Sequence, residues 1–357
     1  MQNILDNLEE IKKIDSQNML GSLELLGKQV AQIDGHAKEV KMPKAYGAVK
    51  NIVILGMGGS ALGADIIKSV FNDELKVPLE AARDYHLPGY VDANSFVVVS
   101  SYSGTTEECL AGLSEAKKKK AKLAIICSGG VLAQEAKKNK IPALVFSTEN
   151  NPCGSPRMGL GYSIVGLLVV LHKAGLVDLK NSDIKMMKDV VDKYQKKFSA
   201  SSPGSSNLAK QFAEKTQRKS VWFVASEHLA GNAHVAANQT NENTKRFGGY
   251  FLIPELNHHL MEGMMNPESN KDNLLFVFFE SLLYDKRVQK RYEVSKEVLN
   301  KNSVQWVSYV CEEKDRLSQA CELLVFSGYL SFYSAMLAGI DPTAIPFVDY
   351  FKEQLKK

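Results

Sequence analysis

The feature that most constrains the fold is a repeated alternation of short apolar runs with helical segments. The first run, residues 51–55 (NIVIL), stops at glycines and is followed by a helical pattern over residues 62–70. Short apolar runs that end at glycines are typical of strands buried on both faces of a parallel sheet. Strands that alternate with helices predict a doubly wound α/β fold.

This alternation occurs twice along the chain. The other strand-like runs are residues 77–82, 95–101, 123–128 and 143–147 in the first half, and 220–226, 250–255, 273–280 and 303–310 in the second. A buried helix is expected over 159–174, a polar amphipathic helix over 180–197 and a long helix over 317–337. The length of 357 residues also favours two domains, at about 150 residues for each.

We therefore expect two α/β domains in tandem, each a doubly wound parallel sheet of the flavodoxin-like type. The stretch 199–207 (SASSPGSSN) carries the strongest linker signal. The expected division is a helical segment (1–46), a first domain (47–198), the linker (199–207), a second domain (208–330) and a helical C-terminal segment (331–357).

Composition excludes several classes of protein. The 44 basic residues exceed the 40 acidic ones by only four and are spread along the chain, which disfavours a nucleic-acid partner. The five cysteines contain no CxxC pair, so the spacing predicts neither a disulfide framework nor a metal site. The N-terminus lacks a signal-peptide pattern, and the longest apolar run (159–171) is too short for a bilayer, so we expect a cytoplasmic protein without a membrane partner.

Two loops after predicted strands have the chemistry of an anion site. In the first, Gly58, Gly59 and Ser60 open a helix, where glycines admit an anion to free N–H groups. This loop also fits G-x-G-x-x-G/A, so a dinucleotide site stays open on this loop alone. The second loop, residues 100–106 (SSYSGTT), is rich in hydroxyls that suit a phosphate monoester; the alternative is that they are only helix caps.

Together, GMGGSALG (56–63) and SYSGTTEE (101–108) resemble the sugar isomerase (SIS) domain, which binds phosphosugars at these loops. The resemblance implies two SIS-type domains and a sugar phosphate ligand. The residues that match the phosphate-binding pattern are Ser60, Ser101, Ser103 and Thr106, with Gly58 and Gly59 beside them.

The second half concentrates acid–base residues around a predicted helix–strand passage. Glu242 lies in NENTK (241–245), and His258 lies in PELNHH (254–259). Isomerisation of an aldose phosphate needs a carboxylate to move a proton between adjacent carbons, a group such as histidine to open the sugar ring, and a cation to stabilise the enediolate. The alternative for a lone Glu or His is a helix cap or a structural hydrogen bond, and Glu255 is the next candidate for the base.

The combined pattern resembles the bifunctional phosphoglucose/phosphomannose isomerases of the archaeal and bacterial type, from about residue 51 to the C-terminus. That resemblance implies Glu242 as the proton-shuttling base and His258 as the ring-opening residue, contributed by the neighbouring subunit of a homodimer. It also implies Arg157 in SPRMGLGY as the enediolate-stabilising cation and Lys352 in the C-terminal helix as a further site residue. The implied reaction interconverts glucose 6-phosphate, and mannose 6-phosphate, with fructose 6-phosphate without a cofactor.

The sequence departs from the family's motifs at one position, leaves a second uncertain, and allows two alternative functions. The family's PELNHN has His259 at its last position here, and Thr343 is the only candidate for the threonine that the family links to mannose 6-phosphate. A non-catalytic phosphosugar-binding SIS regulator is the first alternative, in which Glu242 and His258 would have no purpose. A nucleotide-dependent oxidoreductase is the second; Asp84 could mimic its ribose-binding acid, but the hydroxyl loop counts against it.

Overall fold

A parallel sheet forms the centre of the first domain in the computed structural model, which describes residues 4–355 and residue 357. Its strand order is β2-β1-β3-β4-β5, and every neighbouring pair is parallel. The strands are β1 (Asn51–Leu55), β2 (Leu79–Ala82), β3 (Ser95–Ser101), β4 (Lys122–Cys127) and β5 (Ala143–Val145). The register places Ile54 between Ala81 and Val98, so the apolar run of β1 lies at the middle of the sheet.

Both faces of this sheet are covered by helices, which is why its strands are apolar throughout. Alternate residues serve different cores. Ile52 and Val98 pack into a core that continues into the second domain, whereas Val53 and Val97 pack into a separate core with residues of α5 and α6. The helices of this domain are α4 (Gly59–Val70), α5 (Glu107–Lys118) and α6 (Gly130–Asn139).

The second domain repeats this build with four strands. Its order, β7-β6-β8-β9, is the same as that of the first four strands of the first domain, and all pairs are again parallel. The strands are β6 (Ser220–Ala225), β7 (Gly248–Leu252), β8 (Leu274–Glu280) and β9 (Gln305–Val310). The expected tandem of doubly wound domains is therefore confirmed.

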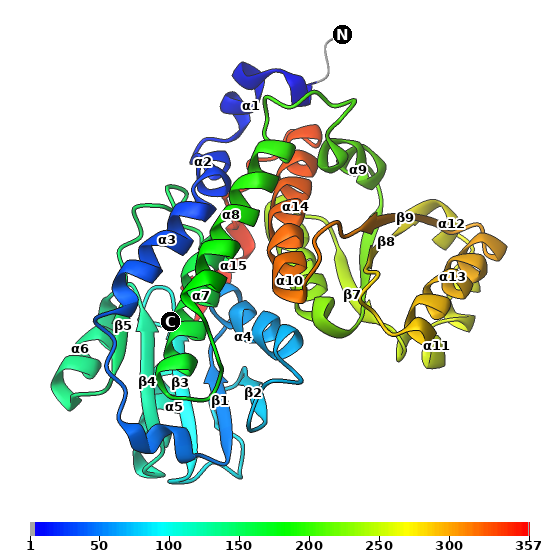
Figure 1. The fold of residues 1–357 in the computed structure, drawn as a ribbon. Helices are drawn as coiled ribbons and strands as arrows, with labels where there is room; N and C mark the ends of the chain where they lie inside the picture. The colour runs from blue at the N-terminus through cyan, green and yellow to red at the C-terminus, as the bar shows by residue number, and fades with distance from the viewer. Residues whose placement is uncertain (1–3, 356) are drawn as a thin grey trace.

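A layer of helices joins the two sheets, as Figure 1 shows. It contains α7 (Leu160–Lys173), α8 (Asn181–Phe198), α10 (Ala230–Thr244) and α14 (Arg316–Leu337). Helix α14 is long and apolar enough to cross a membrane, but 94% of its apolar window is buried inside the protein, as in a core helix. The same helix runs without a break through residue 330, so the expected domain boundary there falls inside α14, and the separate C-terminal helix is α15 (Pro346–Gln354).

The remaining elements flank these layers. They are η1 (Ile4–Asp6), α1 (Leu8–Ile14), α2 (Met19–Glu24), α3 (Leu26–Ala37), η2 (Lys44–Ala48), η3 (Pro156–Met158), α9 (Leu208–Thr216), η4 (Glu227–Leu229), α11 (Leu256–His259), η5 (Glu262–Met265), α12 (Asn270–Asn273) and α13 (Lys286–Lys301).

The stretch 199–207 joins α8 to α9 without helix or strand, and it is held in place. Lys210 is 1% exposed, and its ammonium donates to the carbonyls of Ala200 and Ser202, both at 2.8 Å. A third hydrogen bond joins the same ammonium to Asp6 at 2.8 Å. The segment is therefore an ordered linker that the hydrogen bonds of Lys210 hold in place.

Candidate active site

The two predicted phosphate loops lie side by side at the carboxyl edge of the first sheet. The backbone N–H of Tyr102 donates to Ser60 Oγ at 2.8 Å, and Ser100 Oγ donates to the Ser60 carbonyl at 2.9 Å. Gly58 has φ +47° in the first loop, a conformation that favours glycine. The loops after β1 and β3 meet at the point where the strand order reverses, which is where ligands bind in doubly wound sheets.

The hydroxyls of the second loop mostly bond to one another. Ser101 Oγ and Thr106 Oγ1 lie 2.7 Å apart, and Thr106, the residue that precedes α5, makes no side-chain cap. Ser103 is exposed, and its Oγ accepts from the Thr105 hydroxyl at 3.0 Å. Because Ser101 is 1% exposed, it shapes the loop, and Ser103 is the more open of the two serines.

The backbone of Arg157 packs against the first phosphate loop, and its side chain extends to the second domain. A Cβ added to Gly59 would lie only 2.7 Å from the backbone nitrogen of Arg157, so only glycine lets this segment approach the start of α4. The Arg157 side chain is 2% exposed. Its Nε donates to Asn243 Oδ1 at 2.5 Å, and its Nη1 donates to Glu242 Oε2 at 3.0 Å.

The other end of the guanidinium holds the chain before α15. Arg157 Nη2 donates to the carbonyls of Pro342 (2.9 Å) and Thr343 (3.1 Å). Within residues 4–355 and 357, four of the five N–H donors of the guanidinium have partners, and one on Nη1 remains for a ligand. Burial lowers the pKa of Arg157, whereas the charge of Glu242 raises it.

Glu242 and Lys245 lie at the carboxyl end of α10. The Glu242 side chain is about one-third exposed, and among the described residues only its Oε2 has a hydrogen-bond partner. Lys245 Nζ donates to the Asp341 carbonyl at 2.7 Å and to the Pro342 carbonyl at 3.1 Å. Partial burial of the ammonium, together with the nearby charge of Arg157, lowers the pKa of Lys245 to about 8.

Among the described residues, the structure brings neither His258 nor Lys352 into hydrogen-bond or ion-pair contact with this cluster. Strand β7, five residues or roughly 16 Å long, separates the end of α10 from α11, which carries His258. Lys352 lies on α15, and every residue of that helix is exposed. Within the described part of the chain, neither side chain has a hydrogen-bond or ion-pair partner. Of the acid–base and cationic candidates, the structure brings together Arg157 and Glu242.

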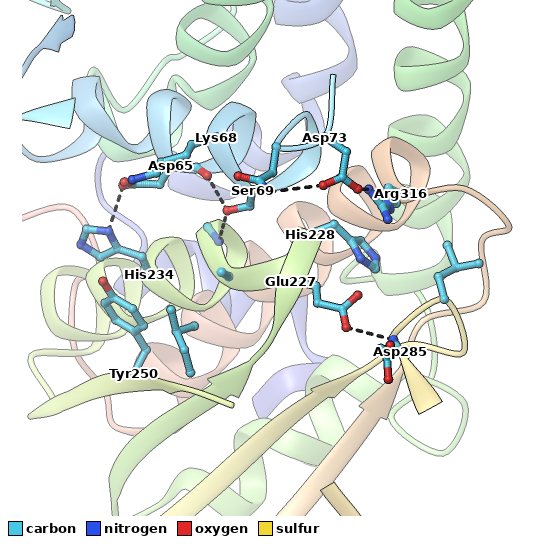
Figure 2. Close-up of a pocket in the computed structure, with 15 residues that line it drawn as sticks. Asp65, Lys68, Ser69, Asp73, Glu227, His228, His234, Tyr250, Asp285 and Arg316 are labelled. Atoms are coloured by element: carbon cyan, nitrogen blue, oxygen red, sulfur yellow. Dashed lines mark hydrogen bonds and ion pairs between the residues drawn. The ribbon is translucent and has the colours of Figure 1, made fainter. Parts of the chain in front are cut away.

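The second sheet has its own cavity, of about 750 Å³, at the equivalent edge (Figure 2). The loops after β6 and β8 line it, through Glu227 and Asp285. Four carboxylates face it against Lys68 and Arg316, and Arg316 is already paired with Asp73 at 2.7 Å. This charge balance disfavours an anionic ligand in this cavity.

Sequence reasoning missed three polar residues that complete the site. Asn243 and Gln239 lie four residues apart on α10, and both contact Arg157: Asn243 through its side-chain oxygen and Gln239 through the Arg157 carbonyl at 3.3 Å. Lys245 is the third. The motif NENTK contained two of them, but only the fold shows that they face Arg157.

Comparison with known proteins gives the family. A model of the SIS domain matches residues 48–148, and a model described as the bacterial phospho-glucose isomerase C-terminal SIS domain matches residues 205–355. A bifunctional phosphoglucose/phosphomannose isomerase from Caldicellulosiruptor bescii is 30% identical over 347 residues, covering 94% of this chain and 98% of that protein. The chain belongs to this family.

The chain is also similar to other proteins, one of them a further member of this family. A family member from Aquifex aeolicus is 29% identical, over 86% of this chain and 91% of that protein. A crystal structure of a putative phosphosugar isomerase from Clostridium difficile 630 matches the fold with a TM-score of 0.71 at 14% identity, covering 93% of this chain and 97% of the other. A D-glucosamine-6-phosphate 4-epimerase from Sulfolobus acidocaldarius is 29% identical over a shorter part, 62% of this chain and 66% of that protein.

Proposed function

We propose that this isomerase-family chain interconverts glucose 6-phosphate, and mannose 6-phosphate, with fructose 6-phosphate through a cis-enediolate. The observation that carries the proposal is the contact of Arg157 with Glu242 next to the two phosphate loops. A carboxylate and a buried guanidinium are the two groups that proton transfer between adjacent carbons requires.

The phosphate of the substrate binds at the first domain. Backbone N–H groups at the start of α4 and the hydroxyls of Ser60, Ser103 and Thr106 face it, and Ser101 holds the loop through Thr106. Arg157 rests on Gly59, so the sugar chain extends from the phosphate toward the guanidinium and Glu242.

Glu242 moves the proton. Its Oε2 is held by Arg157, which leaves Oε1 to take the proton from C2 of the aldose and return it to C1. The remaining Nη1–H of Arg157 stabilises the negative oxygen of the enediolate, while the other four donors keep the guanidinium in place. The protein's own groups thus supply the base and the cation, as in a cofactor-independent reaction.

His258 opens the sugar ring, and it comes from the partner subunit of a homodimer. A whole strand separates His258 from Glu242 within one chain, and the His258 side chain is exposed. The adjacent His259 ring packs against Phe251, with centroids 5.9 Å apart, which favours His258 as the reactive imidazole. Ring opening at neutral pH suits an imidazole.

Helix α15 carries Lys352 to the site when the dimer forms. Three large apolar side chains on this helix, those of Phe347, Tyr350 and Phe351, are between 60% and 86% exposed, and Leu355 directly after the helix is 61% exposed. Such a cluster is typical of a surface that another protein chain covers. In the proposed dimer, Lys352 reaches the site through this contact.

Thr343 is the residue that faces the epimeric carbon. It is 6% exposed, its carbonyl accepts from Arg157, and its hydroxyl is buried without a hydrogen-bond partner in the described chain. An unpaired buried hydroxyl is costly, and a substrate hydroxyl that pairs with it offsets that cost. This arrangement supports the acceptance of both glucose and mannose phosphates.

The non-catalytic regulator is the weaker alternative, because a binding protein has no use for the Glu242–Arg157 pair. All five cysteines are buried thiols, in keeping with a cytoplasmic protein, which we also propose.

The test is incubation of the purified protein with fructose 6-phosphate, followed by separate quantitation of the glucose and mannose phosphates. Formation of both products supports the proposal. Absence of both, in protein that still binds the sugar phosphate, would support the regulator instead.

A further inference from the structure

Lys245 follows the end of α10, three residues after Glu242, and it has no role in the proton transfer described above. Its ammonium lies among three carbonyl oxygens, those of Asp341 (2.7 Å), Pro342 (3.1 Å) and Asn243 (3.4 Å). Two of these carbonyls belong to the segment that joins α14 to α15. Lys245 therefore bonds the helix of the base to the chain that leads to α15.

Arg157 holds the same segment. The Pro342 carbonyl accepts from both Arg157 Nη2 and Lys245 Nζ, and the Thr343 carbonyl accepts from Arg157 as well. Within the segment, the Thr343 N–H donates to Asp341 Oδ1 at 2.8 Å. Two cations from different domains thus fix three consecutive residues, one of which carries the unpaired hydroxyl.

We propose that Lys245 is a positioning residue that, together with Arg157, clamps residues 341–343 and so fixes Thr343 relative to Glu242, since Arg157 contacts both. The proposal rests on the proposed isomerase function and extends it: Lys245 touches no substrate and acts through the segment that it holds. It predicts that Lys245 governs the ratio of the two sugar epimers.

Stability alone does not explain this lysine. Its ammonium faces Arg157 from η3, which repels it, and Glu242 from α10 and Asp341 from the segment, which attract it. The lowered pKa of Lys245 means that folding disfavours its charged form. Groups kept in such surroundings are concentrated at functional sites.

The test compares Lys245→Met and Lys245→Arg with a matched control, Lys140→Met. Lys140 ends α6 with φ 53° and ψ 37°, almost the backbone of Lys245 at 52° and 30°, but its side chain is exposed far from the site. Four quantities are measured: kcat on each sugar phosphate, the inhibition constant of inorganic phosphate, the thermal midpoint, and hydrogen exchange of peptides that cover residues 338–350.

For Lys245→Met we expect kcat to fall by about tenfold or more, since a hydrogen bond to a charged group is worth roughly that factor. The mannose-to-glucose ratio should change, exchange at 341–349 should speed up, and the phosphate inhibition constant should stay within about twofold because the loops are untouched. Lys245→Arg should restore most of kcat, and it should remain active above pH 8, where the wild type loses activity as Lys245 gives up its proton. The thermal midpoint of Lys245→Met should fall by at most about 2–4 °C, which corresponds to about one lost hydrogen bond, and the midpoints of Lys245→Arg and Lys140→Met should match the wild type.

Wild-type kcat, epimer ratio and exchange in Lys245→Met would overturn the clamp. A fall in kcat accompanied by a large loss of phosphate affinity and a large fall in thermal midpoint would also overturn it, because these three changes together indicate that the whole protein is destabilised. Failure of the proposed function has a different signature: the wild type itself would convert neither sugar, while the exchange measurement would still decide whether Lys245 holds residues 341–343.

Discussion

Arg157→Lys removes the planar fork on which the site is built and keeps the positive charge. The guanidinium uses four donors at 2.5–3.1 Å on Asn243, Glu242, Pro342 and Thr343. A lysine ammonium has three donors at a single point and cannot reach acceptors spread along the edges of the guanidinium, so at least two buried acceptors lose their partner.

Each acceptor left unpaired in the interior costs about 1–3 kcal/mol, so the loss of two partners should lower the free energy of unfolding by about 2–6 kcal/mol. At about 2 °C per kcal/mol for a chain of this size, the thermal midpoint should fall by roughly 4–12 °C. Loss of a preorganised donor to the enediolate should lower kcat by about a hundredfold or more.

The assay is thermal unfolding followed by circular dichroism, with isomerase activity measured well below both midpoints. Arg287→Lys is the matched control, because Arg287 also pairs with a carboxylate, that of Asp285 at 3.0 Å, but its side chain is 89% exposed. A surface pair of this kind contributes about 0–1 kcal/mol, so the control should unfold and react like the wild type. An Arg157→Lys protein with a wild-type midpoint and more than a tenth of wild-type kcat would refute the reasoning.

Three further outcomes follow from the structure. Replacing both Ser103 and Thr106 by Ala should weaken substrate binding at least about tenfold, measured by calorimetry, and unchanged affinity would remove the phosphate site from this loop. Glu242→Gln and His258→Ala should each be inactive, but after the two variants are mixed and exchange subunits, activity should recover to at most about a quarter of wild type. Half of the dimers are then mixed, and each mixed dimer has one intact site of two. Activity that stays at background after exchange would mean that His258 acts within its own chain. Burial alone raises the pKa of Asp65, but hydrogen bonds from a histidine and an arginine hold it below its ordinary value. The stabilisation is therefore present above about pH 4 and is lost as pH falls through the lowered pKa. Asp65→Asn should lower the urea midpoint of unfolding at pH 7, and the midpoints at pH 7 and pH 3 should differ less in the variant than in the wild type. Equal midpoints for the two proteins at pH 7 would count against the interaction.

The fold was predictable because its signals are local. Buried parallel strands leave continuous apolar runs, and each run from 51–55 to 303–310 became a strand within a few residues of the expected bounds. The long helix expected over 317–337 is α14, but this helix continues past residue 330, where the domain boundary was expected. Domain boundaries depend on which surfaces pack together, and the two sheets here share a core through α14, which no local pattern reveals.

The candidate site could be predicted where one loop carries several groups of one chemistry, as with the hydroxyls of 101–106 and the glycines of 58–59. Their role in binding phosphate stays a prediction. Asn243 and Lys245 could not be singled out in this way, because their significance lies in contacts with Arg157 and Pro342, 86 and 97 residues away in sequence. In the proposed homodimer His258 comes from a second subunit, and no local sequence pattern encodes a contact between two chains.

The central claim is that Glu242 is the base of an aldose–ketose isomerase, and Glu242→Gln in deuterated water tests it most directly. The amide keeps the size of the side chain and can bind near Arg157, but it cannot accept a proton. Incubated with fructose 6-phosphate, the wild type should form glucose and mannose 6-phosphates with deuterium at C2. Glu242→Gln should bind the sugar phosphate with near-normal affinity, form neither product and incorporate no deuterium. Deuterated product from Glu242→Gln at a tenth of the wild-type rate or more would contradict the account and move the base to another residue, with Glu255 the next to be tested.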